Sequence, residues 1–236
     1  PSKLKKEIAV YGSNVSKKNV TIKSIYNNID IKDLKYQSKT NQYLKIFKKD
    51  IFKYNPQIIE IHNRPNYVID IYKDFNKIHY ILIIHNDPLH LKGSMSVEER
   101  IKLLNICANI YFVSKWVQEK FFKGIEKNFY NNFHVVYPSI NLIKKFPKKK
   151  NIIIFSGKLN RSKGFPYFAQ AVIKILNKYK NWHSIVLGNE PREKYNYKHR
   201  RLKYMGWVPY NEVLKYYTKS SITVAPSEWE EPFGRS

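Results

Sequence analysis

Two loops in the second half of the sequence carry side chains that could bind a phosphorylated sugar. The first loop, residues 157–164, follows an apolar run and holds Lys158 and Lys163 beside glycines. The second loop, residues 226–234, follows another apolar run and holds acidic side chains around Glu231. Lysines suit the two phosphates of an activated sugar, whereas a carboxylate accepts hydrogen bonds from sugar hydroxyls. The pairing predicts a site for a nucleotide-activated sugar.

The sequence offers fixed cations rather than a metal ion for such a site. It contains no Asp-x-Asp pair and no cluster of histidines and cysteines at ligand spacing, so we expect no metal and no cofactor. Departure of a sugar from a diphosphate builds negative charge, which enzymes stabilise with cations or helix N-termini. The candidates are Lys158, Lys163 and the helix start after Gly164. Surface solvation is the alternative for both lysines, and Arg161 is either a further phosphate ligand or solvated.

Strands and helices that could position these loops alternate along the chain. Apolar runs bounded by turn residues predict strands, and amphipathic runs between them predict helices. The expected strands are 57–61, 78–84, 110–113, 133–137, 152–155, 184–187 and 222–225, and the expected helices are 67–75, 96–109, one capped by Ser114, 166–179 and 211–219. This order predicts parallel sheets with ligand-binding loops at the carboxyl edges of the strands. Cys107 falls in the helical pattern of 96–109, where we expect it in the core.

The alternating pattern stops at a lysine-rich stretch and then starts again, which predicts two domains. We expect a first domain at 1–140, a linker at 141–150 and a second domain at 151–236. The opening strand of the first domain is indistinct, and residues 9–13 are its nearest match. The second domain ends at Ser236, where a further helix should begin, so we expect the sequence to be part of a longer protein.

The composition of the 236 residues fits a folded protein with a strongly basic surface. Hydrophobic residues make up 43% and aromatic residues 15%, which argues against disorder. The formal net charge is +25, but lysine dominates, so we attribute the charge to solvated helix faces rather than to nucleic-acid binding. The same excess would favour a peripheral contact with an anionic membrane. No apolar run approaches the roughly 20 residues of a membrane-spanning helix, and a single cysteine fits a reducing cytoplasm.

The loops of the second domain resemble the nucleotide-sugar domain of family 4 glycosyltransferases, which are retaining enzymes with the GT-B fold. That family shows Gly-Arg, a spacer and Lys-Gly after one strand, and Pro-Ser followed by Glu-x-Phe-Gly after a later one. The matching residues are Gly157-Lys158, Lys163-Gly164, Gly188, Gly206-Trp207-Val208, Pro226-Ser227 and Glu231-Pro232-Phe233-Gly234. Lysine at position 158 replaces the family's arginine, which removes a bidentate contact to phosphate. A second glutamate of the motif would fall at position 239, past the end of the sequence.

The resemblance implies a role in donor binding for each of these residues. The implied ligands are Lys158, Lys163, Gly157 and Gly164 for the phosphates, Glu231, Phe233 and Gly234 for the sugar, and Gly206, Trp207 and Val208 for the nucleobase. Glu231 would hold the sugar hydroxyls as a catalytic carboxylate. Trp207 would border the base and also pack partly in the core. Glu228 and Glu230 are interpreted as solvated neighbours.

The first domain resembles the acceptor-binding domain of the same family more loosely. His62 ends a predicted strand and corresponds to a family histidine that faces the sugar across the cleft. There it would hold a hydroxyl or stabilise an oxocarbenium-like transition state, and a packing role is the alternative. Asn63, Arg64 and Asp87 are implied on the acceptor side.

The resemblance implies an α/β protein of GT-B type, with two Rossmann-like parallel-sheet domains. It would transfer a sugar, with retention, from a UDP- or GDP-linked donor to a glycan or a lipid-linked acceptor. The expected setting is the synthesis of bacterial lipopolysaccharide or another cell-surface polysaccharide, in the cytoplasm at the inner face of the membrane. The main alternative is a catalytically incomplete GT-B-like binding module, and a nucleic-acid binder is a more distant one.

Overall fold

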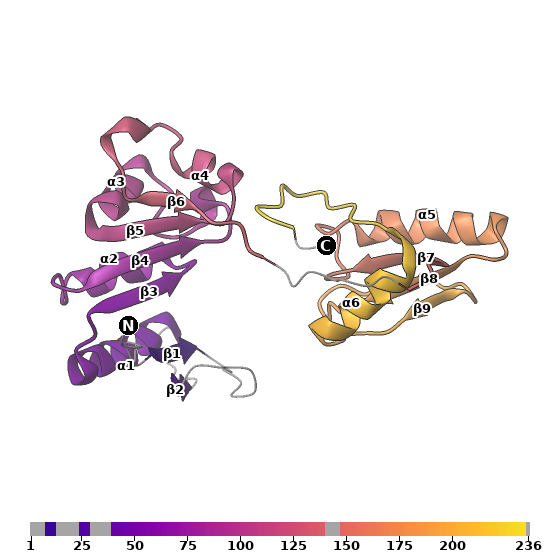
Figure 1. The fold of residues 1–236 in the computed structure, drawn as a ribbon, viewed down its shortest axis with the longest axis horizontal. Helices are drawn as coiled ribbons and strands as arrows, with labels where there is room; N and C mark the ends of the chain where they lie inside the picture. The colour runs from indigo at the N-terminus through magenta and orange to yellow at the C-terminus, as the bar shows by residue number, and fades with distance from the viewer. Residues whose placement is uncertain (1–7, 13–23, 29–38, 140–146, 235–236) are drawn as a thin grey trace. The chain divides into compact units, whose positions relative to one another are not determined.

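The computed structural model describes residues 8–12, 24–28, 39–139 and 147–234, drawn as a ribbon in Figure 1. The chain divides into two compact units, Pro1–Tyr137 and Pro138–Ser236. The sequence placed the end of the first domain at residue 140. Most of the expected linker at 141–150 lies outside the described residues, and its last residue, Lys150, already belongs to a strand.

The first unit contains a four-stranded parallel sheet in the order β3-β4-β5-β6. Its strands are β3 (Ile58–His62), β4 (His79–Ile84), β5 (Cys107–Phe112) and β6 (Phe133–Val135), and the helices between them are α2 (Pro65–Tyr72), η2 (Pro88–His90), α3 (Val97–Ile106), α4 (Lys115–Phe121) and η3 (Lys127–Phe129). Because side chains alternate along a strand, β3 buries Ile59 and Ile61 and exposes Glu60 and His62. The carboxyl end of β3 therefore presents polar groups on one face.

The boundary between α3 and β5 differs from the sequence prediction. The capping box is present, since Ser96 accepts from the backbone N–H of Glu99 and the Glu99 carboxylate accepts from that of Ser96. The helix ends at Ile106 instead of continuing to residue 109, and Cys107 begins β5, paired with Tyr80. The apolar positions fit both periods, and pairing with β4 decides between them. Cys107 is buried as expected, and burial raises the pKa of its thiol to about 12.

Three described elements near the start of the chain precede this sheet. They are β1 (Ile8–Gly12), β2 (Ser24–Asn28) and α1 (Lys39–Tyr54). β1 and β2 pair in parallel, and β1 overlaps the indistinct strand expected at 9–13, of which residue 13 lies outside the described residues. The sequence pattern did not predict α1. Lysines and other polar residues interrupt its apolar positions, and only a few of its side chains, such as Leu44 and Ile51, are buried.

The second unit contains a parallel sheet in the order β10-β7-β8-β9. Its elements are β7 (Lys150–Ser156), α5 (Phe165–Lys178), β8 (His183–Leu187), β9 (Leu202–Tyr204), α6 (Tyr210–Lys219) and β10 (Ser220–Thr223). One face of the sheet packs against α5, where Ile153, Phe155 and Val186 meet Phe165, Phe168 and Val172. The helix α6 contacts β7 and β10. The sequence did not predict β9, which has only three residues.

The order of the strands fixes where polar loops can gather in the second unit. From β7 the chain moves outward to β8 and β9, and then returns through α6 to β10 on the other side of β7. The loops after β7 and β10 therefore leave neighbouring strands at the same edge, at the point where the strand order reverses. Ligands of open α/β sheets bind at such switch points. Within the described residues, no helix is long and apolar enough to span a membrane.

Candidate functional site

The loop after β7 is a compact turn that presents Lys163. The side-chain oxygen Oδ1 of Asn160 accepts from the backbone N–H of Lys163 at 3.0 Å and from the hydroxyl of Ser162 at 3.1 Å. The N–H of Gly164 donates to the carbonyl of Arg161 at 2.8 Å. These bonds fix the turn just before α5 begins. Lys158 lies earlier in the same loop, with an exposed side chain.

The loops after β7 and β10 are in direct backbone contact. Gly164 has φ +67°, and a Cβ added to it would lie 1.8 Å from the carbonyl oxygen of Pro226. No other residue type fits there without moving one of the two loops. The backbone N–H of Glu228 also donates to the carbonyl of Ser162 at 3.0 Å. The glycine of the Lys-Gly pair thus permits the close approach of the acidic loop.

This approach brings the two principal residues predicted from sequence into an ion pair. Nζ of Lys163 lies 2.7 Å from Oε1 of Glu231, and each side chain is 27% exposed. The hydroxyl of Ser227 donates to the same carboxylate oxygen, and Nζ of Lys163 lies 5.1 Å from the centre of the Trp229 ring. Burial raises the pKa of Glu231, but the hydrogen bonds from Lys163 and Ser227 outweigh it, so the pKa is lowered. The carboxylate is ionised at neutral pH.

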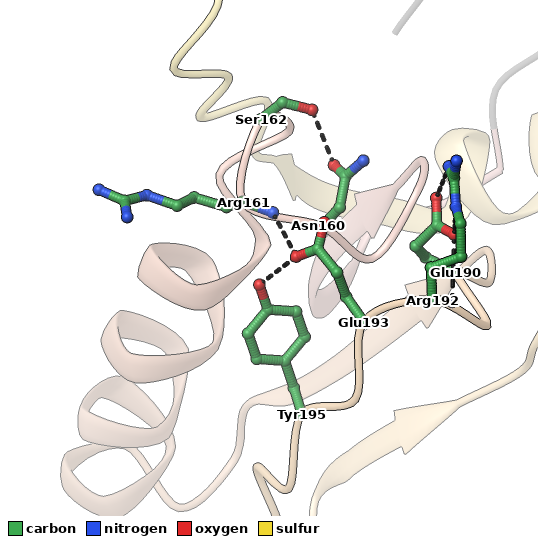
Figure 2. A network of polar contacts seen from close by, with 7 residues as sticks. All are labelled: Asn160, Arg161, Ser162, Glu190, Arg192, Glu193 and Tyr195. Atoms are coloured by element: carbon green, nitrogen blue, oxygen red, sulfur yellow. Dashed lines mark hydrogen bonds and ion pairs between the residues drawn. The ribbon is translucent and has the colours of Figure 1, made fainter.

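A second set of contacts joins the loop after β7 to the acidic loop and to the loop after β8. Nε of Arg161 lies 3.3 Å from a carboxylate oxygen of Glu228. The backbone N–H of Arg161 donates to Glu193 at 3.1 Å, and the hydroxyl of Tyr195 donates to the same oxygen at 2.5 Å, as Figure 2 shows. The expectation that Glu228 is merely solvated is therefore wrong, because its loop packs against Arg161. Arg161 itself is paired, rather than simply solvated.

The loop after β8 holds an ion pair that sequence reasoning missed. Glu190 accepts from Nε and Nη2 of Arg192, each at 2.8 Å (Figure 2). The Glu190 side chain is 4% exposed. The bonds from Arg192 lower the pKa of Glu190 to about 2, and the charge of Lys158 contributes. A glutamate two residues beyond the strand-end Gly188 is a signal that could have pointed to it.

The residues predicted near the nucleobase follow β9. The N–H of Gly188 donates to the carbonyl of Gly206 at 2.7 Å, which joins the ends of β8 and β9. Trp207 is 76% exposed, so the expected packing of its ring in the core is wrong. Val208 is half-buried beside it. An exposed indole at this edge leaves a flat aromatic surface available to a ligand.

The remaining residues predicted for the donor site follow Glu231 in the acidic loop. Pro232 is buried, Phe233 is half-buried and Gly234 is exposed. A Cβ added to Gly234 would lie 3.6 Å from Oε2 of Glu231, an ordinary contact distance. Gly234 thus lies close to the carboxylate, and the backbone roles assigned to Phe233 and Gly234 stay predictions.

In the first unit, His62 is part of a hydrogen-bonded chain of three side chains. Its Nε2 lies 2.7 Å from Oε1 of Glu60, and its Nδ1 lies 2.9 Å from Nε2 of His85. The two imidazole rings are stacked, with centres 5.2 Å apart. Glu60 and His62 share a face of β3 because they are two residues apart, and His85 directly follows β4. Sequence reasoning missed Glu60 and His85, although the i, i+2 spacing of an acid and a histidine was a usable signal.

The other acceptor-side residues shape the turns after β3 and β4. Asn63 adopts φ +57°, and its Oδ1 accepts from the N–H groups of His85 and Asn86, each at 3.2 Å. Arg64 donates to the carbonyl of Asn63 at 2.9 Å. Asp87 accepts from the N–H of Leu89 at 2.9 Å and so caps the short helix η2. Each of these contacts orders local backbone, and the acceptor-side roles stay predictions.

The structure thus gathers the predicted donor ligands within the second unit and the predicted acceptor-side residues within the first. Lys158, Lys163 and Glu231 lie on the loops at the switch point of the second sheet. His62, Asn63 and the turn at Asp87 lie at the carboxyl edge of the first sheet. In the part of the chain that the structure describes, no group of three or more histidine, cysteine, aspartate or glutamate side chains is placed to hold a metal ion.

Two α/β units, each built on a parallel sheet, are the architecture of GT-B proteins. Comparison with known proteins supports the class. Residues 139–236 match the family model described as Glycosyl transferases group 1. The matched residues fall in the second unit, which is therefore similar to this family. The predicted fold class is confirmed.

Solved structures of the same fold include one with UDP-glucose bound and one galactosyltransferase. Anabaena Alr3699/HepE in complex with UDP-glucose superposes with a TM-score of 0.64 at 13% identity, over 89% of this chain and 63% of that one. The apo form of WaaB, a lipopolysaccharide outer core galactosyltransferase, gives a TM-score of 0.56 at 14% identity, over 90% of this chain and 60% of that one. At such identities the likeness concerns the fold.

A curated relative resembles nearly the whole chain. It is an uncharacterized 42.6 kDa protein in the cps region of Klebsiella pneumoniae, 26% identical over 253 aligned positions. The match covers 95% of this chain and 63% of the relative. The chain thus spans less than two thirds of the length of this relative and of both solved structures.

Proposed function

We propose that the protein transfers a sugar, with retention of anomeric configuration and without a metal ion, from a nucleoside-diphosphate sugar to a glycan or a lipid-linked acceptor. The observation that carries the proposal is the contact between the Lys-Gly loop and the acidic loop at the switch point of the second sheet. It joins a cation that suits a diphosphate to a carboxylate that suits sugar hydroxyls, 2.7 Å apart. A nucleotide sugar carries both groups side by side, because its diphosphate is bonded directly to the sugar.

Each donor ligand has a task that follows from its chemistry. Lys163, assisted by Lys158, would neutralise the diphosphate, which gains charge as the sugar departs. Glu231 would accept hydrogen bonds from the sugar hydroxyls, with backbone N–H groups of Phe233 and Gly234 beside it. The exposed ring of Trp207 would lie against the nucleobase. His62 would hold a sugar hydroxyl or stabilise the oxocarbenium-like transition state, with Asn63, Arg64 and Asp87 on the acceptor side.

The nature of the donor is proposed as UDP-linked, with a GDP-linked donor as the second candidate. The HepE structure that shares the fold is a complex with UDP-glucose. A thermal-shift panel of UDP, GDP, ADP and their common sugar conjugates, with and without magnesium, tests this. A ligand that binds only the folded state stabilises it by about 2.7 kcal/mol at a hundredfold excess over its Kd. We expect one nucleotide to raise Tm equally in magnesium and in EDTA. A shift that requires magnesium would refute the metal-independent proposal.

The rival proposal is a GT-B-like binding module that lacks catalysis. Both proposals predict donor binding, so the distinguishing measurement is slow hydrolysis of the donor followed by NMR. An active retaining site should first release the sugar with the same anomeric configuration that it has in the donor. Binding without any release would support the module, and release of the opposite anomer would refute retention.

The setting proposed is the synthesis of a bacterial cell-surface polysaccharide such as lipopolysaccharide. It is supported by the cps-region relative and by the lipopolysaccharide galactosyltransferase of the same fold. The net charge of +25 supports a peripheral contact with the anionic inner face of the membrane. Co-sedimentation with vesicles made with and without anionic lipid tests that contact. Equal sedimentation with both would refute it.

A further inference from the structure

The residues proposed to hold the diphosphate and the sugar of the donor are bound to each other. Lys163 and Glu231 form an ion pair at 2.7 Å, and the hydroxyl of Ser227 donates to the same carboxylate oxygen. We propose that this pair makes the site select an intact nucleoside-diphosphate sugar over the free nucleoside diphosphate. The inference rests on the proposed function, because it concerns what must happen to the pair when a donor binds.

The pair is held together by the loops on which its members lie. Gly164 follows Lys163 directly, and its backbone lies against the carbonyl of Pro226 too closely to admit a Cβ. A backbone hydrogen bond of 3.0 Å from Glu228 to Ser162 adds a second connection between the two loops. The charges cannot separate by a movement of the loops without breaking these contacts. A ligand must therefore compete for them where they are.

The surroundings of the pair make an unpaired charge costly. Each side chain is 27% exposed, so water screens the pair less than it screens an ion pair on the open surface. The ring of Trp229 lies near Nζ of Lys163 and can stabilise the ammonium group. The other groups that hydrogen-bond to the Glu231 carboxylate, the side chains of Ser227 and Trp229, are neutral. If Lys163 turns to another anion, the Glu231 carboxylate loses its counter-ion.

A free nucleoside diphosphate and an intact donor differ in how they affect the ion pair of Lys163 and Glu231. The free diphosphate takes Lys163, leaves Glu231 without a counter-ion and places its own charge near that carboxylate. An intact donor brings phosphate oxygens to Lys163 and hydroxyl donors to Glu231, so both members of the pair are satisfied again. Specificity is a difference of affinities, and here Glu231 weakens binding of one ligand while it strengthens binding of the other.

The test is whether Glu231→Gln strengthens the binding of UDP and at the same time weakens the binding of UDP-glucose. We expect Glu231→Gln to bind UDP about 3- to 10-fold more tightly than the original protein, because the competitor for Lys163 has lost its charge. The same variant should bind UDP-glucose about tenfold more weakly, because glutamine is a poorer acceptor for hydroxyls. Isothermal titration calorimetry measures both, with GDP and GDP-mannose as the second pair of probes.

Glu228→Gln is the matched control. It removes one negative charge from the same loop, but its partner is Arg161. The ratio of the two affinities should stay within about twofold of the original in this variant. An equal gain in UDP affinity from Glu228→Gln would show a general charge effect and overturn the proposal.

Three outcomes separate the inference from the proposed function. If Glu231→Gln leaves UDP affinity unchanged or weakens it, Glu231 is an ordinary hydroxyl ligand and the inference is wrong. If Lys163→Met abolishes the gain caused by Glu231→Gln, the gain acts through Lys163, as the inference requires. If the original protein binds neither pair of probes, the proposed function itself fails, and the inference with it. Should Glu231→Gln not fold, Glu231→Ala replaces it, with the same expected directions.

Discussion

The polar cluster of the second unit and that of the first are assembled in different ways. Lys163 and Glu231 come from two loops, 68 residues apart in sequence, whose backbones touch. Glu60 and His62 instead lie on β3, and His85 directly follows β4. The two strands pair with His62 opposite Ile83, two residues before His85, and this register brings the three side chains together. The first arrangement depends on a contact between loops, and the second depends on the sheet itself. Changes to a loop should therefore disturb the two clusters unequally.

The two clusters also differ in what their contacts leave open. In the second unit, opposite charges neutralise each other, and a ligand must exchange with both. In the first unit, both ring nitrogens of His62 are engaged, although His62 and Glu60 are each 52% exposed. A carboxylate accepts at this contact, so a neutral His62 donates from Nε2 and accepts at Nδ1 from His85. The role predicted for His62 therefore involves Glu60 and His85 as positioning partners.

Gly164→Ala should have the largest effect on the second cluster while sparing the first. The new Cβ would collide with the carbonyl of Pro226, and the left-handed backbone adds strain, so we expect a loss of about 2–4 kcal/mol in the stability of the second unit. Gly206→Ala is a matched control, because Gly206 has the same φ of +67° and nothing within 4 Å of the added Cβ. It should lose only about 1 kcal/mol. Urea unfolding measures both, and equal losses would contradict the close contact.

Lys163→Ala should weaken donor binding next most strongly. Loss of a charged hydrogen-bond donor to phosphate costs about 1.5–3 kcal/mol, or roughly 10- to 150-fold in Kd. Lys158→Ala, which removes an exposed lysine from the same loop, should cost less. Calorimetry with UDP-glucose measures both variants, and circular dichroism checks that they fold. Unchanged affinity in Lys163→Ala would remove the phosphate role from this residue.

His62→Ala should separate the two clusters in function. We expect turnover of the donor to fall at least about tenfold while donor affinity falls much less, because the proposed phosphate and nucleobase ligands lie in the other unit. Glu60→Gln should also lower turnover, but less severely, because the His62 ring loses the carboxylate that orients it. Long-range 15N–1H NMR of the imidazoles should report a proton on Nε2 of His62 in the original protein and a mixture of tautomers in Glu60→Gln. If His62→Ala turns over the donor as fast as the original protein does, His62 has only a packing role.

Glu190→Gln should have the smallest effect, which depends on pH. The pKa of Glu190 is lowered from 4.5 to about 2, chiefly by Arg192, so its contribution to stability is complete above about pH 4.5 and is lost as the pH falls toward 2. The difference in Tm between the original protein and Glu190→Gln should be largest at neutral pH and shrink over that range. A difference that stays constant from neutral pH down to about pH 2 would show that the ion pair does not carry it.

Regular patterns in the sequence sufficed for most of the fold, whereas contacts between distant segments did not. Except for the three-residue β9, the strands of both four-stranded sheets follow apolar runs, and the loop motifs fell at the expected edge. The end of α3 was misplaced because Leu104, Cys107 and Ile110 follow helical spacing, and only the pairing with β4 makes Cys107 the start of a strand. No spacing in the sequence indicates that Lys163 and Glu231 bind each other, because that depends on the approach of two loops. The bidentate contact of Arg192 with Glu190 was missed because the burial of the Glu190 side chain distinguishes this pair, and residue types alone do not reveal burial.

The position of Cys107 makes its thiol a chemical probe of local unfolding in the first unit. It is the one cysteine of the sequence, it begins β5 in the first unit, and its thiol is buried with a pKa of about 12. Thiol reagents react with the thiolate, so labelling at neutral pH requires β5 to open. The rate of labelling then reports local unfolding of the first unit alone, since the second unit has no cysteine. A donor that binds only the second unit would leave that rate unchanged unless the two units are energetically coupled.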